Sequence, residues 1–226
     1  MASGRPDHPR PGRAAPDPGR LVLANQPNRR LARSPECLLT LSHVRSVVPM
    51  TMMSPDPQTA LRARLAASSD GVLETLAAEH GLSVREAAAC LPPETGLEVS
   101  GAHFLEVLSD IASWGEILLL THTEAGILEC KGALPAGTLG HGYYNLRGAG
   151  PLGGHLRPEA CAALRFVSRP FMGHESHAVW FFAASGAVLF KIFVGRTAQG
   201  GLEAEQVARF NALKARLAAA ESPHGE

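Results

Sequence analysis

Histidines are concentrated in the second half of the chain. The 226 residues contain ten histidines, and five of them lie between positions 122 and 177. One histidine in such a segment would more often be a satisfied core or surface residue. Five on the strands and loops of one predicted sheet favour a ligand-binding site. They are His122, His141, His155, His174 and His177.

The spacing of His174 and His177 bears on metal binding. On a helix, two residues three apart could share one metal ion. On a strand they point to opposite faces, because side chains alternate. The surrounding sequence is typical of an extended segment, so we do not expect these two histidines to form a chelate.

Strand alternation also predicts the surroundings of His177. It places His177 on one face with Val179 and Phe181, and a neutral imidazole beside apolar side chains suits an axial ligand of haem iron. A phenolate is another haem ligand, and Tyr143 is predicted to share a strand face with His141. The alternatives are a His177 hydrogen-bonded to a neighbouring carbonyl and a Tyr143 that is simply half-buried in the sheet.

Patterns typical of enzymes are weak in this sequence. Residues 148–153 match G-x-G-x-x-G by letter, but a dinucleotide site needs this motif between a strand and a helix, and no long helix is predicted after it. No Ser/His/Asp grouping or pair of carboxylates stands out, so we expect a protein that is not an enzyme. The cysteines contain no C-x-x-C, which argues against a structural zinc site and predicts reduced thiols in a cytoplasmic protein. They are Cys37, Cys90, Cys130 and Cys161.

Residues 73–91 have the look of a helix-turn-helix, with Gly81 in the turn. A recognition helix needs side chains that read base edges. Here only Arg85 is a strong candidate, and Glu86 would repel phosphate. The chain has 21 basic and 21 acidic residues, without the basic excess usual in a nucleic-acid binder. We interpret these helices as a packing unit and expect no nucleic-acid partner.

The first 53 residues differ in composition from the rest. Residues 1–50 contain eight Arg and eight Pro but three acidic residues, a net charge of +5. Such a segment buries too little apolar surface to offset its conformational entropy. Because Met50, Met52 and Met53 lie where the globular pattern begins, residues 1–53 are predicted to be a disordered tail or an over-extended gene prediction. One domain is expected over residues 54–222.

The remaining sequence predicts the elements that position these side chains. Helical patterns occupy residues 56–67, 72–81, 83–91, 102–114 and 203–219, with Asp56 and Ser83 as N-caps. Strand patterns occupy residues 115–123, 127–131, 139–147, 161–168, 177–183 and 187–194, and a Gly-rich loop covers residues 148–154. This order predicts an α+β fold with N-terminal helices, a largely antiparallel β-sheet and a C-terminal helix. No apolar run reaches the ~20 residues of a membrane helix, so no membrane insertion is expected.

Long contiguous motifs relate the chain to a known family. The longest is HGYYNLRGAGPLGGHLRPEACAALRFVSRPFMGHESHAVWFF, and two further ones are WGEILLLTHTEAGILECKGALPAG and EAEQVARFNALKARL. Over about residues 58–218 the chain resembles the HutX/ChuX family of cytosolic haem-utilisation carriers. The resemblance implies a haem-binding α+β domain, similar to one half of the larger HemS-type proteins. It also implies a homodimer that passes haem to a downstream haem-degrading protein.

The resemblance also points to particular residues. The family's cleft histidines match His122, in THT, and His155, in GGHLR, while the position after Glu-Ser falls on His177 and Tyr143 lies in a neighbouring motif. Members of the family vary in which of these binds iron, so the ligand stays open among the four. We expect His177 to be the most important.

The function implied is that of a non-enzymatic carrier of non-covalently bound, b-type haem. A carrier of this kind needs apolar walls, one or two iron ligands, and cations near the propionates. Candidate cations are Arg147, Arg157, Arg169, Lys191 and Arg196. The alternative is a haem-degrading enzyme that takes electrons from a partner.

Overall fold

The computed structural model describes residues 56–221. The predictions made for residues 1–53 lie outside the described residues. Within the described part, none of the helices combines the length and the apolar character that crossing a bilayer would require.

Three short helices begin the described chain: α1 (Pro57–Ala67), α2 (Leu73–His80) and α3 (Val84–Ala89). The Asp56 side chain accepts from the Thr59 backbone N–H at the start of α1, and a capping box between Ser83 and Glu86 begins α3. Gly81 ends α2 in the left-handed conformation, with φ of 65°. These local signals were read correctly from the sequence, because a cap depends on residues within one turn.

A six-stranded sheet forms the centre of the domain. Its strand order is β1-β7-β8-β9-β2-β3, and all the pairings are antiparallel. The predicted α+β fold is therefore confirmed. The strands are β1 (Gly96–Ser100), β2 (Glu116–Thr123), β3 (Gly126–Ala133), β7 (Ala163–Phe171), β8 (His174–Phe182) and β9 (Val188–Phe193).

A second sheet of three strands corrects one prediction. Residues 139–147 do not form a single strand but a hairpin of β4 (Gly137–Gly140) and β5 (Tyr143–Leu146), and β6 (Gly154–Leu156) pairs with β5. The chain turns at His141 and Gly142, whose φ angles are 54° and 77°. His141 and Tyr143 therefore do not share a strand face, contrary to the sequence-based prediction.

Other boundaries differ from the predicted ones. Strand β1 was missed, and the residues expected to form helix 102–114 are a 3-10 turn followed by α4 (Phe104–Ile111). The strand expected over residues 161–168 is β7, which runs from Ala163 through Pro170 to Phe171. A proline is tolerated there, since it lies close to the hairpin end of the strand, where a missing backbone donor disturbs little of the ladder.

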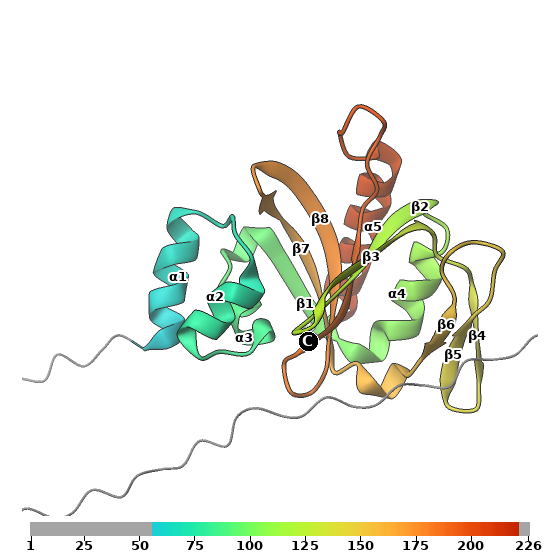
Figure 1. Ribbon diagram of the computed structural model, residues 1–226, viewed down its shortest axis with the longest axis horizontal. Helices are drawn as coiled ribbons and strands as arrows, with labels where there is room; N and C mark the ends of the chain where they lie inside the picture. The colour runs from blue at the N-terminus through green and yellow to red at the C-terminus, as the bar shows by residue number, and fades with distance from the viewer. Residues whose placement is uncertain (1–55, 222–226) are drawn as a thin grey trace, which may run out of the picture. The chain divides into compact units, whose positions relative to one another are not determined.

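The two faces of the large sheet have different partners. On one face, Val179, Phe181 and Ile192 pack in a core with α4 and α5 (Ala204–Glu221). On the other face, Ala178 and Trp180 pack with α1–α3. In Figure 1 these three helices, in blue to green, gather beside β7 and β8, and α5 is drawn in red. Consecutive residues of β8 therefore lie in two separate environments.

Candidate functional site

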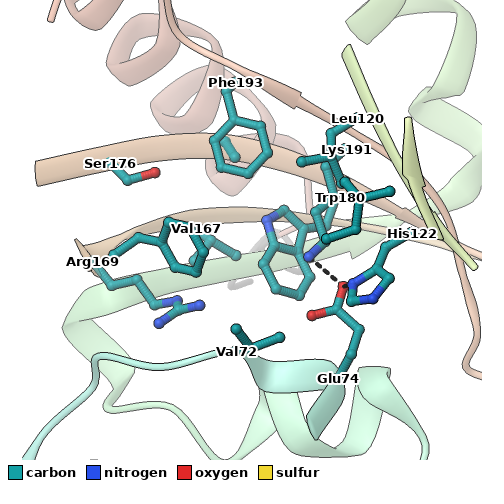
Figure 2. A pocket seen from close by; sticks show the side chains of 13 residues that line it. Val72, Glu74, Leu120, His122, Val167, Arg169, Ser176, Trp180, Lys191 and Phe193 are labelled. Carbon is teal, nitrogen blue, oxygen red and sulfur yellow. Dashed lines mark hydrogen bonds and ion pairs between the residues drawn. The ribbon is translucent and has the colours of Figure 1, made fainter. Parts of the chain in front are cut away.

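A pocket lies on the face of the sheet that α1–α3 partly cover. Its floor comes from β2, β7, β8 and β9, and the start of α2 lies over it (Figure 2). About 530 Å³ in and around it is free of protein atoms, counting the space open to solvent. It is lined by Val72, Glu74, Leu120, His122, Ile127, Val167, Arg169, Phe171, Ser176, Ala178, Trp180, Lys191 and Phe193.

Charged side chains meet at one end of this pocket. The Glu74 Oε1 atom accepts from Lys191 Nζ at 2.5 Å and lies 3.4 Å from His122 Nδ1. Figure 2 shows Glu74 extending from α2 toward both side chains. A single carboxylate therefore neutralises Lys191 and engages the imidazole of the pocket.

Burial shifts both members of the Glu74–Lys191 pair. Burial lowers the pKa of Lys191 below its usual value, and the charge and hydrogen bond of Glu74 offset only part of this effect. For Glu74, burial raises the pKa, but the charge and hydrogen bond of Lys191 outweigh it, and the pKa lies below the usual value. The charged form of Lys191 inside the domain therefore depends on a carboxylate partner.

Trp180 provides a flat wall beside the charges. The Lys191 ammonium lies 3.7 Å from the centroid of the Trp180 ring, an arrangement that gives a favourable cation–π interaction. The indole is 2% exposed, and its Nε1 has no hydrogen-bond partner among the described residues. Buried donors in proteins nearly always have an acceptor, so this N–H requires an explanation.

The connection between α1 and α2 is fastened over the pocket. Arg169 Nη1 donates to the Ser69 carbonyl at 2.7 Å, and Nη2 donates to the Gly71 carbonyl at 2.8 Å. In return, the Asp70 carboxylate accepts from the backbone N–H groups of Met172 and Gly173 at the β7–β8 turn. These hydrogen bonds from Gly173 and Met172 lower the pKa of Asp70.

A second hollow continues from the pocket along the same face. It shares Leu120, Phe171, Ser176 and Phe193 with the pocket, and about 1080 Å³ is free of protein atoms there, counting the space open to solvent. Its other lining residues include Leu118, Lys131 and Arg196. The two together form a mainly apolar groove whose lining includes charged side chains of both signs, since Glu74 and Glu129 lie there with Lys131, Lys191 and Arg196.

The structure places His177 away from this pocket. Its ring lies on the α5 face of the sheet, 5.2 Å from the ring of Phe210 between centroids. Nδ1 is 2.7 Å from Ser168 Oγ and Nε2 is 3.1 Å from Glu175 Oε1. The predicted strand-mates Val179 and Phe181 do share its face, as alternation indicated. Both ring nitrogens therefore have partners within the domain.

Tyr143 and His155 lie together on the small sheet. Their ring centroids are 6.0 Å apart. Arg157 donates to the Tyr143 hydroxyl through Nε and Nη2, at 3.1 and 2.8 Å, and His155 Nδ1 lies 2.6 Å from Asn145 Oδ1. The structure thus groups the candidate ligands into His122 in the pocket, Tyr143 with His155 on the small sheet, and His177 on the α5 face.

The predicted cations have different surroundings. Arg169 and Lys191 are buried in the pocket wall. Arg196, on the adjoining hollow, donates to the carbonyls of Gly200 and Glu175. Arg147 lies with Tyr143 and His155 around a shallow hollow on the small sheet.

Two motifs that we interpreted as structural from the sequence, the helix-turn-helix-like residues 73–91 and the glycine-rich residues 148–153, contribute to packing and to a loop. The guanidinium of Arg85 binds Glu98 at 2.7 Å, and its backbone N–H donates to the Gly186 carbonyl, so α3 packs against the β8–β9 hairpin. The glycine-rich segment 148–153 is a loop between β5 and β6, and β6 rather than a helix follows it.

Among the lining residues, sequence reasoning named His122, Arg169 and Lys191 as candidates and missed the others, including Glu74 and Trp180. The signal for Trp180 was available, because alternation put it on the face opposite to His177. Glu74 gave no signal, since its partner Lys191 is 117 residues away in the chain.

Comparisons with known proteins identify the family of the chain. The family described as haem utilisation ChuX/HutX matches residues 97–213. The intracellular heme transport protein HutX of Vibrio cholerae is 42% identical over 125 residues, which span 55% of this chain and 65% of that relative. The chain thus covers slightly less than two thirds of the length of this curated relative.

Solved structures extend the match to the fold. A protein from Erwinia carotovora is 42% identical with a TM-score of 0.68, and ChuX is 36% identical with a TM-score of 0.67. In both cases 70% of this chain and 98% of the other chain are covered. The larger PhuS of Pseudomonas aeruginosa, 17% identical, shares the fold over 46% of its length with a TM-score of 0.58. The chain belongs to the ChuX/HutX family of haem-utilisation proteins.

Proposed function

We propose that this protein is an intracellular carrier that binds haem without a covalent bond and passes it to a haem-degrading partner. Its family membership supports the proposal, together with two relatives whose names are the intracellular heme transport protein HutX and the heme binding protein ChuX. We also propose that it acts in the cytoplasm, as a homodimer, and without degrading haem itself.

One observation supports haem as the cargo of this pocket. An imidazole, a flat indole wall and a buried ammonium occur side by side, from His122, Trp180 and Lys191. Haem presents an iron that binds imidazole, a flat apolar ring and two carboxylates, so each feature of the cargo has a counterpart here. Phe171 and Phe193 extend the apolar wall into the adjoining hollow.

The four candidate ligands have different access to a haem in this pocket. His122 lines the pocket directly, and its side chain is 25% exposed. We therefore propose His122 as the iron ligand from this face. Ligation by His177 stays a prediction and requires haem to reach the α5 face. Ligation by Tyr143 or His155 requires a haem bound at the small sheet.

Ferric haem titration with absorption spectra tests the proposal. We expect wild-type protein to give a saturable Soret shift at one haem per chain, and His122→Ala to change the ligand-field bands. The exposed His174 on β8 provides a matched control, and His174→Ala should leave the spectrum unchanged. No saturable binding by the wild type would contradict the function. A changed spectrum in His177→Ala, His155→Ala or Tyr143→Phe, with His122→Ala unchanged, would move the ligand there.

A carrier and the alternative, a haem-degrading enzyme, differ in whether the bound haem leaves the protein intact. A carrier keeps the Soret band under reductant and oxygen and loses it only when an acceptor protein removes the haem. Loss of the band by turnover in the protein alone, with appearance of a degradation product, would favour the enzyme.

A further inference from the structure

The wall of the pocket contains two buried hydrogen-bond donors, and one of them has no acceptor within residues 56–221. Lys191 is 6% exposed and obtains its carboxylate from α2, while the Trp180 Nε1–H on the same wall has no acceptor among the described residues. In Figure 2 the indole nitrogen faces the space that Val167, Ser176 and Phe193 surround. The wall thus carries two buried donors, of which only the Lys191 ammonium has an acceptor among the described residues.

We infer that Lys191 and the Trp180 N–H form a carboxylate-binding subsite, that Glu74 occupies part of it in the ligand-free protein, and that a carboxylate of the cargo displaces Glu74. This inference rests on the proposed function and specifies how the cargo enters. Glu74 is an internal substitute for the ligand carboxylate: it keeps Lys191 charged inside the domain until the ligand arrives.

The position of Glu74 suits a displaceable group. It belongs to the first turn of α2, whereas Lys191, Trp180 and His122 belong to the sheet. The side chain of Glu74 is 18% exposed, so its carboxylate can turn toward water once the ligand carboxylate has taken its place beside Lys191. The connection between α1 and α2, which lies over the pocket, is held separately by the hydrogen bonds of Arg169 and Asp70.

The same carboxylate also engages His122. Because Glu74 Oε1 lies 3.4 Å from His122 Nδ1, its departure releases the imidazole at the moment that Lys191 takes a new partner. Binding of a ligand carboxylate and exposure of the candidate iron ligand are therefore one event. A flat apolar ligand without a carboxylate would leave Glu74 in place.

Diamagnetic gallium(III) protoporphyrin IX and its dimethyl ester separate the carboxylate from the rest of the ligand. We expect Glu74→Gln to bind the free acid about tenfold more tightly than wild type and to show no such gain for the ester. Glu79→Gln is the matched control, because Glu79 is exposed on the same helix. An equal gain for both ligands, or Glu74→Gln binding no tighter than Glu79→Gln, would overturn the inference.

The indole signals give a readout independent of affinity. The protein has two tryptophans, and the Trp114 Nε1 already donates to Asp110 Oδ1 at 2.8 Å. In ¹⁵N-correlated NMR spectra, the Trp180 indole proton should move downfield with the free acid more than with the ester, whose ring current is the same. Trp114→Phe assigns the two signals, and no difference between the ligands would reject the Trp180 part of the subsite.

A smaller probe separates failure of this inference from failure of the proposed function. If the wild type binds no porphyrin, the proposed function is wrong, but 2-naphthoate still tests the subsite. It should shift the Trp180 signal in Glu74→Gln, whereas 2-naphthalenemethanol should not. Thermal unfolding of each variant verifies that it is folded, and Glu74→Ala replaces Glu74→Gln if the latter is not. If 2-naphthoate shifts the Trp180 signal neither in the wild type nor in the Glu74 variant, the subsite is overturned.

Discussion

Lys191 and Trp180 are cross-strand partners on β9 and β8, and the Lys191 ammonium lies over the Trp180 ring at 3.7 Å from its centroid. Side chains of such a pair stand on the same face of a sheet and interact directly. Here the pair turns an otherwise apolar sheet face into one that holds a positive charge beside a flat surface. Glu74 completes the arrangement from α2, which ties the helical unit to the sheet electrostatically.

The first prediction concerns the coupling between Glu74 and Lys191. We expect Lys191→Met to lower the free energy of unfolding by about 3 kcal/mol, because it leaves a half-buried carboxylate without its partner. This is the low end for a buried pair, since Glu74 can turn toward water. The double variant Glu74→Gln/Lys191→Met should lose less than the sum of the single losses, with a coupling of about 0.5–3 kcal/mol in urea unfolding. Additive losses would show that the two side chains do not stabilise one another.

The second prediction concerns acid. The folded-state pKa of Glu74 lies below its ordinary value of 4.5, because the charge and hydrogen bond of Lys191 outweigh the effect of burial. Its contribution to stability is therefore present above about pH 4.5 and is lost as the pH falls through the lower folded pKa. Glu74→Gln should flatten the fall in stability with acid in that window, compared with Glu79→Gln, when unfolding is followed from pH 6 to pH 3. Parallel curves for both variants would contradict this assignment.

The third prediction concerns the fastening of the α1–α2 connection. Asp70→Asn removes the charge that accepts hydrogen bonds from the Met172 and Gly173 backbone N–H groups. We expect these two amides to lose protection in hydrogen exchange, while amides in the centre of β8 keep theirs. Since Asp70 is charged far below neutral pH, the wild-type protection should be constant between pH 6 and 8 after correction for intrinsic exchange rates. Unchanged protection in Asp70→Asn would show that the turn is held by other contacts.

The sequence predicted what depends on local chemistry. The N-caps at Asp56 and Ser83 and the turn at Gly81 were found because their partners lie within a few residues. The β4–β5 hairpin was missed because its turn uses His141 at a positive φ, which a non-glycine residue seldom adopts. Strand β1 was missed because it is short and its partner, β7, follows more than 60 residues later.

In the candidate site, too, the features set by local sequence were predicted and those set by distant contacts were not. Alternation correctly paired His177 with Val179 and Phe181, but periodicity cannot tell which face of a strand an element from elsewhere will cover. The packing of α5 onto one face and α1–α3 onto the other places Trp180 in the pocket and His177 beside Phe210. Which helices cover which face is set by tertiary packing, and this packing determines which histidine lines the pocket.

The last prediction concerns His177 itself. Its imidazole is buried, contacts the Phe210 ring and has Ser168 and Glu175 as hydrogen-bond partners. We expect His177→Ala to lower the free energy of unfolding by roughly 1–3 kcal/mol, because it removes packing and leaves the Ser168 hydroxyl without this partner. His174→Ala, on the exposed end of the same strand, should change it by less than about 0.5 kcal/mol. If His177→Ala instead keeps its stability and alters the ferric haem spectrum, then haem reaches the α5 face and His177 is the ligand that the sequence predicted.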